Sequence, residues 1–250
     1  MEEPIILAEH LSKDFILFRR THGFKGMLLH LPKYIQDRTK PHKRRVLNDV
    51  SLAIQKGETI GIAGANGCGK TTLLSIIGGV LKPTSGRVTT RGRISMMLAL
   101  GAGFANDLSG RENIILNGVL QGIPYREMLR RSEQIIEFSG IDPEFIDSPI
   151  FQYSSGMKAR LGFGVAIMTD PDILLVDEVL AVGDTDFQAK CLETIREKQR
   201  KRMTIVLVSH SAPQIESFCD RLLYINAGRV ELAGPTPEVL AQIRREKRPF

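Results

Sequence analysis

Residues 64–71 constrain this chain most, because they read Gly-Ala-Asn-Gly-Cys-Gly-Lys-Thr, the spacing of a P-loop. Residues 59–63 before them suit a buried strand, and residues 71–80 after them can form a helix. The glycines allow bends that turn successive backbone N–H groups into one concavity, and the helix adds the positive end of its dipole. The segment therefore predicts a phosphate cradle for a nucleoside triphosphate.

Each position of this loop has an expected task. Lys70 would reach the terminal phosphates of ATP, and Thr71 would ligate Mg²⁺, which prefers oxygen ligands. The other positions expected to face the nucleotide are Gly64, Ala65, Asn66, Gly67, Cys68, Gly69 and Thr72. Because Cys68 precedes a helix N-terminus, we expect its thiol pKa to be lowered and MgATP to protect it from thiol reagents. The alternative is an inert small residue.

Composition predicts an ordinary globular chain, since 42% of the 250 residues are hydrophobic and 25% are charged. We expect one domain over residues 1–250, with room for a subdomain. No apolar run reaches the ~18 residues that cross a bilayer, and the first residues do not resemble a signal peptide, so a soluble, cytoplasmic chain is expected. Three cysteines without metal-ligand spacing imply neither a disulfide nor a zinc site.

Positive charge gathers at residues 16–45, where nine Lys and Arg residues stand against Asp37 alone, within a chain of net charge +6. A second basic cluster follows at residues 244–248. Such clusters attract phosphate on nucleic acid or on lipid headgroups, and composition does not choose between them. Apolar residues at helical spacing also occur in the first cluster: Phe24, Met27, Leu28, Leu31 and Ile35. This basic amphipathic insert either packs on its own domain or docks on a membrane surface or partner.

The apolar pattern predicts alternating strands and helices over the rest of the chain. The expected strands lie at residues 5–11, 50–54, 59–63, 94–100, 173–176 and 204–209. The expected helices lie at residues 71–80, 110–139 with a break near 122–124, 157–168 and 186–200. Asn226-Ala227-Gly228-Arg229 between two short apolar runs predicts a hairpin. Continuous apolar runs are typical of parallel strands that are buried on both faces.

Two carboxylates, Asp177 and Glu178, end the predicted strand at residues 173–176. Phosphates bind at the carboxyl edge of such sheets, so both side chains are expected near the nucleotide. Asp177 suits the shell of a magnesium ion, and Glu178 suits the orientation and deprotonation of an attacking water. The alternative is a solvated pair at a strand end.

Residues 153–157 read Tyr-Ser-Ser-Gly-Met at a predicted helix start, where a Ser hydroxyl caps the helix and adds a second anion-binding end. Together with the P-loop and the carboxylate pair, the segment resembles the signature of the ATP-binding cassette (ABC) family, usually written Leu-Ser-Gly-Gly-Gln. It matches at Ser154 and Gly156 and departs at the other three positions. The resemblance covers essentially the whole chain.

This resemblance implies an α/β fold: a P-loop NTPase core of the ABC ATPase type, with a mostly parallel sheet, an antiparallel β part and a helical subdomain at about residues 105–168. It implies that Ser154, Ser155 and Gly156 contact the γ-phosphate held by a second copy. It makes residues 181–184, Ala-Val-Gly-Asp, a dimer-contact loop. His210 takes the place of the switch histidine, which contacts the γ-phosphate and positions water.

This chain fits the family pattern less clearly at two positions, the aromatic residue against adenine and the Gln after the strand at residues 94–100. Phe15 lies where the family places an aromatic ring against adenine, although a core Phe fits equally and Phe18 is the reserve candidate. The Gln that usually follows the strand at residues 94–100 is missing, because residues 97–104 contain none. Gln121 and Gln134 lie too far along the chain to replace it.

Several sequence segments resemble one branch of the family, the ATPase subunits of bacterial exporters for lipid-linked O-antigen, capsule and teichoic-acid polysaccharides. These segments are residues 100–104, 108–113, 153–157 and 176–184. The branch implies ATP and Mg²⁺ as cofactors, a homodimer of the cassette, a polytopic membrane permease, a place on the cytoplasmic face of the plasma membrane, and no nucleic acid. Some members carry a carbohydrate-binding domain after the cassette, for which this chain leaves no room, so we expect a polymer recognised without one.

Two rival functions stay open at this point. One is a soluble cassette ATPase whose basic insert binds nucleic acid or a protein assembly, although such proteins often carry two cassettes. The other is a non-catalytic regulatory cassette, which the presence of Lys70, Asp177, Glu178 and His210 disfavours.

Overall fold

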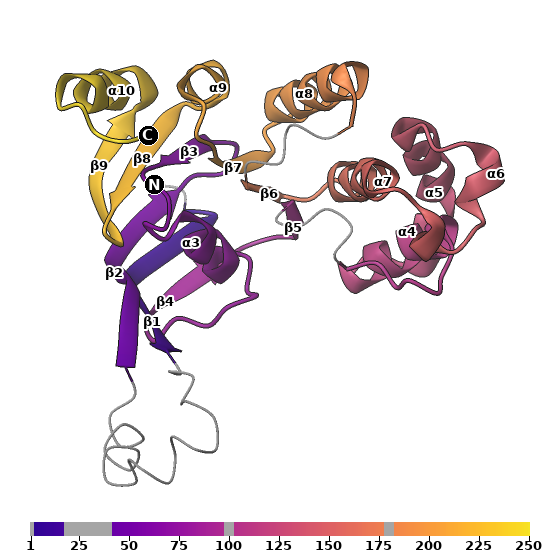
Figure 1. The fold of residues 1–250 in the computed structure, drawn as a ribbon, viewed down its shortest axis with the longest axis horizontal. Coiled ribbons are helices and arrows are strands. Elements are labelled where there is room, and N and C mark those ends of the chain that lie inside the picture. Colours follow the sequence, from indigo (N-terminus) through magenta and orange to yellow (C-terminus); the bar gives the residue numbers. More distant parts are fainter. Residues whose placement is uncertain (1–2, 18–41, 98–102, 178–182) are drawn as a thin grey trace, which may run out of the picture.

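The computed structural model describes residues 3–17, 42–97, 103–177 and 183–250, and contains two β-sheets and a separate group of helices (Figure 1). The larger sheet has the order β5-β6-β7-β3-β8-β9. Its strands are β5 (Ile94–Met97), β6 (Ile173–Asp177), β7 (Thr204–Val208), β3 (Thr59–Ala63), β8 (Arg221–Asn226) and β9 (Arg229–Pro235). All neighbours in it are parallel except β8 and β9. A smaller antiparallel sheet has the order β2 (His42–Ile54), β1 (Ile6–Leu17) and β4 (Ser85–Thr90).

The central strands β6, β7 and β3 of the larger sheet are buried on both faces, which explains why most of their residues are apolar. In β7, Ile205 and Leu207 pack with α8 (Thr185–Arg200), α9 (Ala212–Phe218) and α10 (Thr236–Arg245). On the other face, Val206 and Val208 pack with α3 (Lys70–Ile77) and with residues of the smaller sheet. The P-loop and α3 are therefore held between the two sheets.

A group of helices extends beyond the β5 and β6 side of the larger sheet, on the right of Figure 1. It comprises α4 (Gly110–Leu120), α5 (Tyr125–Ser139), α6 (Pro143–Ile146), the 3₁₀ turn η1 (Ile150–Gln152) and α7 (Ser155–Met168). These helices have their own apolar core, which includes Ile114, Ile135 and Leu161. The predicted α/β class, with its parallel sheet, antiparallel part and helical group, is confirmed.

The predicted elements are present, with shifted ends. The break near residues 122–124 separates α4 from α5, and the turn at residues 226–229 joins β8 to β9. The predicted insert begins and ends inside strands, because β1 runs to Leu17 and β2 starts at His42, with Leu17 paired to His42. The basic residues 43–45 thus belong to β2, and residues 18–41 of the insert lie outside the described residues. The sequence analysis missed β4, which is mostly exposed, and also missed α6, η1, α9 and α10.

No helix in the described part of the chain combines the length and the apolar character that crossing a membrane requires. Cys68, Cys191 and Cys219 are all free and buried. Burial raises the pKa of the Cys191 and Cys219 thiols to about 12.

One buried amide fixes the start of the helical group. Asn113 is fully buried, and its Oδ1 accepts a hydrogen bond from Ala105 N at 2.8 Å. Its Nδ2 donates to the carbonyls of Ala105, Leu108 and Ser109 at 3.0, 3.1 and 2.9 Å. The amide therefore satisfies the loop that leads into α4, where Ser109 and Glu112 form a capping box.

We expect Asn113→Ala to lower the free energy of unfolding by about 2–4 kcal/mol, because several buried backbone groups lose their partner. Urea denaturation measures the change. Asn117→Ala is the matched control, since the Asn117 amide donates to Asn113 O one turn earlier, and we expect a loss below about 1 kcal/mol. Equal losses in the two variants would contradict the role of Asn113.

Candidate functional site

Three predicted site segments meet at the carboxyl edge of the larger sheet. The P-loop follows β3, His210 follows β7, and Asp177 ends β6, with β7 lying between the other two strands. The register aligns their ends, because Val208 pairs with Ile62 on one side and with Asp177 on the other. Phosphate-binding sites in open α/β sheets lie at this edge.

The loop itself bends sharply at its glycines. Gly64, Gly67 and Gly69 have φ angles of +143°, +75° and +112°. A Cβ at Gly64 would lie 2.0 Å from Ile225 O, and one at Gly69 would lie 2.7 Å from Leu47 Cδ2. Two of the three glycines are therefore required by close neighbours as well as by backbone conformation.

The β8–β9 hairpin and β2 hold the loop from outside. Gly228 N donates to Cys68 O at 3.1 Å, and Asn48 N donates to Gly228 O at 2.8 Å. The hairpin turn has positive φ at Ala227 and Gly228, which lets it approach the loop closely. The loop is thus tied to both sheets by backbone hydrogen bonds.

Lys70 is buried, with 6% of its surface exposed, and its ammonium group stays inside the loop. Its Nζ donates to Gly64 O at 2.6 Å and to Ala65 O at 3.2 Å. No carboxylate in the described part of the chain pairs with it. A buried ammonium group of this kind favours an anionic ligand, because carbonyl groups alone do not neutralise its charge.

A pocket of about 290 Å³ opens above the loop. It is lined by Arg44, Val46, Asn66, Gly67, Gly69, Lys70, Thr71, Thr72 and His210. The structure thus gathers most of the predicted loop residues with the predicted histidine. It also adds Arg44 and Val46, which the sequence analysis did not select, although Arg44 is one of the nine basic residues counted at residues 16–45.

Cys68 contradicts the prediction of a lowered thiol pKa. Only 6% of its surface is exposed, and the side chain packs in the core beneath the loop. Burial raises the pKa of this thiol, and the nearby Lys70 charge opposes the shift without cancelling it. The prediction was wrong because it considered the helix N-terminus and not the direction of the side chain. A neutral thiol is a poor nucleophile, so the expected reaction with thiol reagents is not supported.

His210 lies in a short connection that hydrogen bonds hold on both sides. Ser209 Oγ donates to Gln214 Oε1 at 2.6 Å and accepts from Ser211 N at 3.0 Å. Ser211 then caps α9. The exposed imidazole lies with Nδ1 3.3 Å from Phe250 O. Its neighbours therefore fix the backbone of His210 while the ring lines the pocket.

The signature segment is well formed but does not line this pocket. Ser154 caps α7, and its Oγ accepts from Met157 N at 3.1 Å. Ser155 is exposed and Gly156 is half-buried. The buried Tyr153 anchors the segment, because its hydroxyl donates to Phe145 O at 2.7 Å. The structure thus presents this helix N-terminus away from the P-loop of the same chain.

Phe15 also does not line the pocket. It is half-buried in β1, and Lys13 Nζ lies 5.2 Å from the centroid of its ring. Glu178, Phe18 and part of the predicted dimer-contact loop lie outside the described residues. Gly183 and Asp184 of that loop are described, and Asp184 caps α8 by accepting from Phe187 N at 2.9 Å.

Comparison with known proteins places this site in a family. The sequence profile of the ABC transporter family matches residues 47–181, which include the P-loop, the signature and the carboxylate pair. The chain belongs to the ABC transporter family. The recognition made from the motifs is therefore confirmed, and the ABC cassette is an ATPase by class.

Relatives of this ABC cassette include named export subunits. The O-antigen export system ATP-binding protein RfbB of Klebsiella pneumoniae is 46% identical over 239 residues, which cover 95% of this chain and 96% of the relative. The teichoic acids export ATP-binding protein TagH of Listeria innocua is 40% identical over 94% of this chain and 68% of the relative.

Solved structures agree with this ABC cassette in fold. One is a dimeric ATP-binding cassette bound to ADP and Pi in a post-hydrolysis state, with a TM-score of 0.72 and 21% identity over 92% of this chain and 98% of that one. Another is an ATP-binding subunit of an ABC transporter, with a TM-score of 0.74 and 22% identity over 97% and 93% of the two chains.

We expect Gly64→Ala to lower the free energy of unfolding by about 3 kcal/mol or more, because a new Cβ would overlap a backbone carbonyl that cannot move away. Gly67→Ala is the matched control: it also has positive φ, yet its Cβ would have no neighbour within 4 Å. The control should lose about 1 kcal/mol. Urea denaturation without nucleotide measures the free energy of unfolding of both variants. Equal losses would show that the positive φ alone, and not contact with Ile225 O, causes the destabilisation.

Proposed function

We propose that this chain is the ATP-hydrolysing subunit of an ABC exporter that drives a lipid-linked polysaccharide of the O-antigen, capsule or teichoic-acid type across the cytoplasmic membrane. The single observation that carries the proposal is the pocket on a complete P-loop, with Lys70 buried beneath it, in a chain related over its length to named export ATP-binding proteins. The likeness to export subunits supports the substrate class.

Within each site, different residues of the chain bind the phosphates and activate the attacking water. Lys70 binds the terminal phosphates, backbone N–H groups of residues 64–72 surround the phosphate chain, and His210 contacts the γ-phosphate. Glu178, which directly follows Asp177 in the sequence, orients and deprotonates the attacking water. Positioning and charge stabilisation supply most of the rate enhancement.

Thr71 and Asp177 would hold Mg²⁺. Thr71 is exposed in the first turn of α3, and Asp177 is half-buried at the end of β6. Only β7 separates β6 from β3, the strand that leads into the P-loop and α3. A hydroxyl and a carboxylate are hard oxygen ligands, which suit this ion. When bound, Mg²⁺ neutralises charge on the β- and γ-phosphate oxygens.

Two copies of the chain would enclose two ATP molecules. Ser154, Ser155 and Gly156 of one copy would contact the γ-phosphate held by the other, which is supported by the position of this helix N-terminus outside its own pocket. Because ATP would touch both copies only when they close, its binding favours the closed dimer, and hydrolysis reopens it. This differential binding would move an attached polytopic permease on the cytoplasmic face of the membrane, where the chain would be peripheral.

We expect Glu178→Gln to retain ATP affinity but to lower kcat for ATP hydrolysis by about 100-fold or more, since the amide cannot accept the proton of the attacking water. The variant should also accumulate as a dimer with ATP on size exclusion. Glu193→Gln on the exposed face of α8 is the control and should hydrolyse ATP normally. Turnover near that of wild type in Glu178→Gln would remove Glu178 from this role.

The exporter assignment is tested by purifying the tagged chain from its native membranes in mild detergent. We expect a multi-spanning membrane protein to co-elute, and the complex to hydrolyse MgATP. A wash in high salt is the control, because binding through nucleic acid phosphates is strongly salt-dependent. Elution of the chain alone, or with nucleic acid that high salt removes, would instead support the soluble ATPase.

A further inference from the structure

The β2 wall of the nucleotide pocket belongs to none of the sequence motifs. Arg44 and Val46, two residues apart on β2, both line the pocket. The register between β1 and β2 shifts here, because Asp14 pairs with Arg45 while Lys13 pairs with Leu47, which leaves Val46 as an extra residue of β2. Such a bulge changes where side chains point, and here it accompanies two side chains at the pocket.

Arg44 differs from its neighbour in what it contacts. Arg45 makes a two-point ion pair with Asp14, with Nε to Oδ1 at 2.8 Å and NH2 to Oδ2 at 3.2 Å. This pair lowers the pKa of Asp14, chiefly through the Arg45 hydrogen bond. No carboxylate in the described part of the chain pairs with Arg44, which is exposed at the pocket. Of the two neighbouring arginines, Arg44 is therefore the one whose guanidinium group can contact a ligand.

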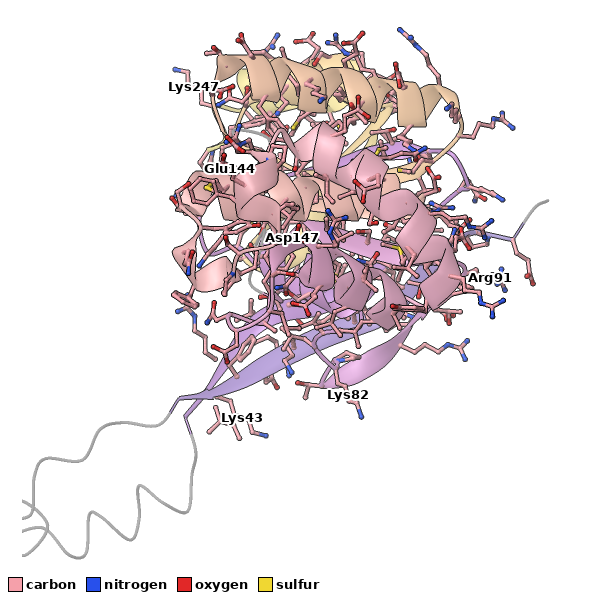
Figure 2. All side chains as sticks on the ribbon, turned by 90° about the vertical axis from the view of Figure 1, so that its right-hand side faces the viewer. Lys43, Lys82, Arg91, Glu144, Asp147 and Lys247 are labelled. Carbon is pink, nitrogen blue, oxygen red and sulfur yellow. The ribbon has the colours of Figure 1, made fainter. Side chains whose placement is uncertain are left out.

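Phe15 is the cross-strand partner of Arg44, so their side chains start from adjacent positions on the same face of the smaller sheet. The Lys13 ammonium group lies over the Phe15 ring, and it is held there by a 2.7 Å hydrogen bond to Lys82 O. Figure 2 labels the side chains of Lys43, which is on β2 next to Arg44, and of Lys82, both in the lower part of the view. The ring thus already has a cation against it, whereas Arg44 reaches the pocket.

The parts of a nucleotide fit different walls of this pocket. The loop and the α3 N-terminus offer N–H groups and Lys70 to the phosphates, and His210 stands after β7. Val46 and Arg44 offer an apolar side chain and a planar cation, which suit an aromatic base. A guanidinium group stacks on an aromatic plane without reading its edge.

We propose that Arg44 stacks on the base of the bound nucleotide and takes the place expected of Phe15 in the family pattern. The inference rests on the proposed function, since it assumes that ATP occupies this pocket. Arg44 is then a binding residue whose contribution depends on the base and not on the phosphate chain.

Calorimetric titration of the full chain with MgATP and with inorganic tripolyphosphate tests this assignment. Arg44→Ala should weaken ATP binding roughly five- to thirty-fold and change tripolyphosphate binding less than about two-fold, as expected for a stacking contact. Arg44→Lys should recover little, because an ammonium group is not planar. Arg45→Ala, which removes the same charge next door, and Phe15→Leu are matched controls and should bind ATP like wild type.

Three results would overturn the assignment. Unchanged ATP affinity in Arg44→Ala would remove Arg44 from the site. Equal weakening of ATP and tripolyphosphate would make Arg44 a phosphate contact. A loss in Phe15→Leu without a loss in Arg44→Ala would return the base to Phe15. Failure of the wild-type chain to bind MgATP would instead contradict the proposed function, so the two failures are distinct.

Discussion

The fixed bend of the P-loop is the constraint on which the rest of the site depends. The loop is tied to the β8–β9 hairpin through Gly228 N and Cys68 O, and the hairpin is tied to β2 through Asn48 N. Because the backbone is held from outside, its N–H groups and the α3 N-terminus are oriented before any ligand arrives. Lys70 is buried against the loop carbonyls as a consequence, so the cradle is largely pre-formed.

The helical group joins the larger sheet through an aromatic cluster. Phe138, Phe163 and Phe187 come from α5, α7 and α8, with ring centroids 5.7 to 6.1 Å apart. Lys190 of α8 adds a contact, because its Nζ lies 4.5 Å from the Phe138 ring centroid and donates to Phe138 O at 2.9 Å. The signature helix α7 is therefore packed against α8, which begins just after the predicted dimer-contact loop. This packing connects the signature helix to the helix that follows the predicted dimer-contact loop.

Sequence reasoning was reliable where a residue type has one physical use in its setting. Gly64 and Gly69 form the sharp bends that the sequence predicts, since such a loop before a helix admits few alternatives. It was less reliable for Cys68 and Phe15, because side-chain direction depends on neighbours that are distant in the chain. Cys68 turns into the core, and Phe15 lies beside Lys13. The edges of the basic insert were misplaced because charged residues continue into β2. Cross-strand pairing with β1, and not residue charge, sets where this strand begins.

The sequence by itself determined the family, the parallel strands, the bent loop and the order of the predicted site segments, because these follow from local spacing and apolar periodicity. Only the tertiary structure decided that β7 lies between β6 and β3, so that Asp177, His210 and the P-loop share one edge. It also decided that Arg44 and Val46 line the pocket and that Phe15 does not. These outcomes depend on strand order, register and packing between distant segments, which local sequence does not encode.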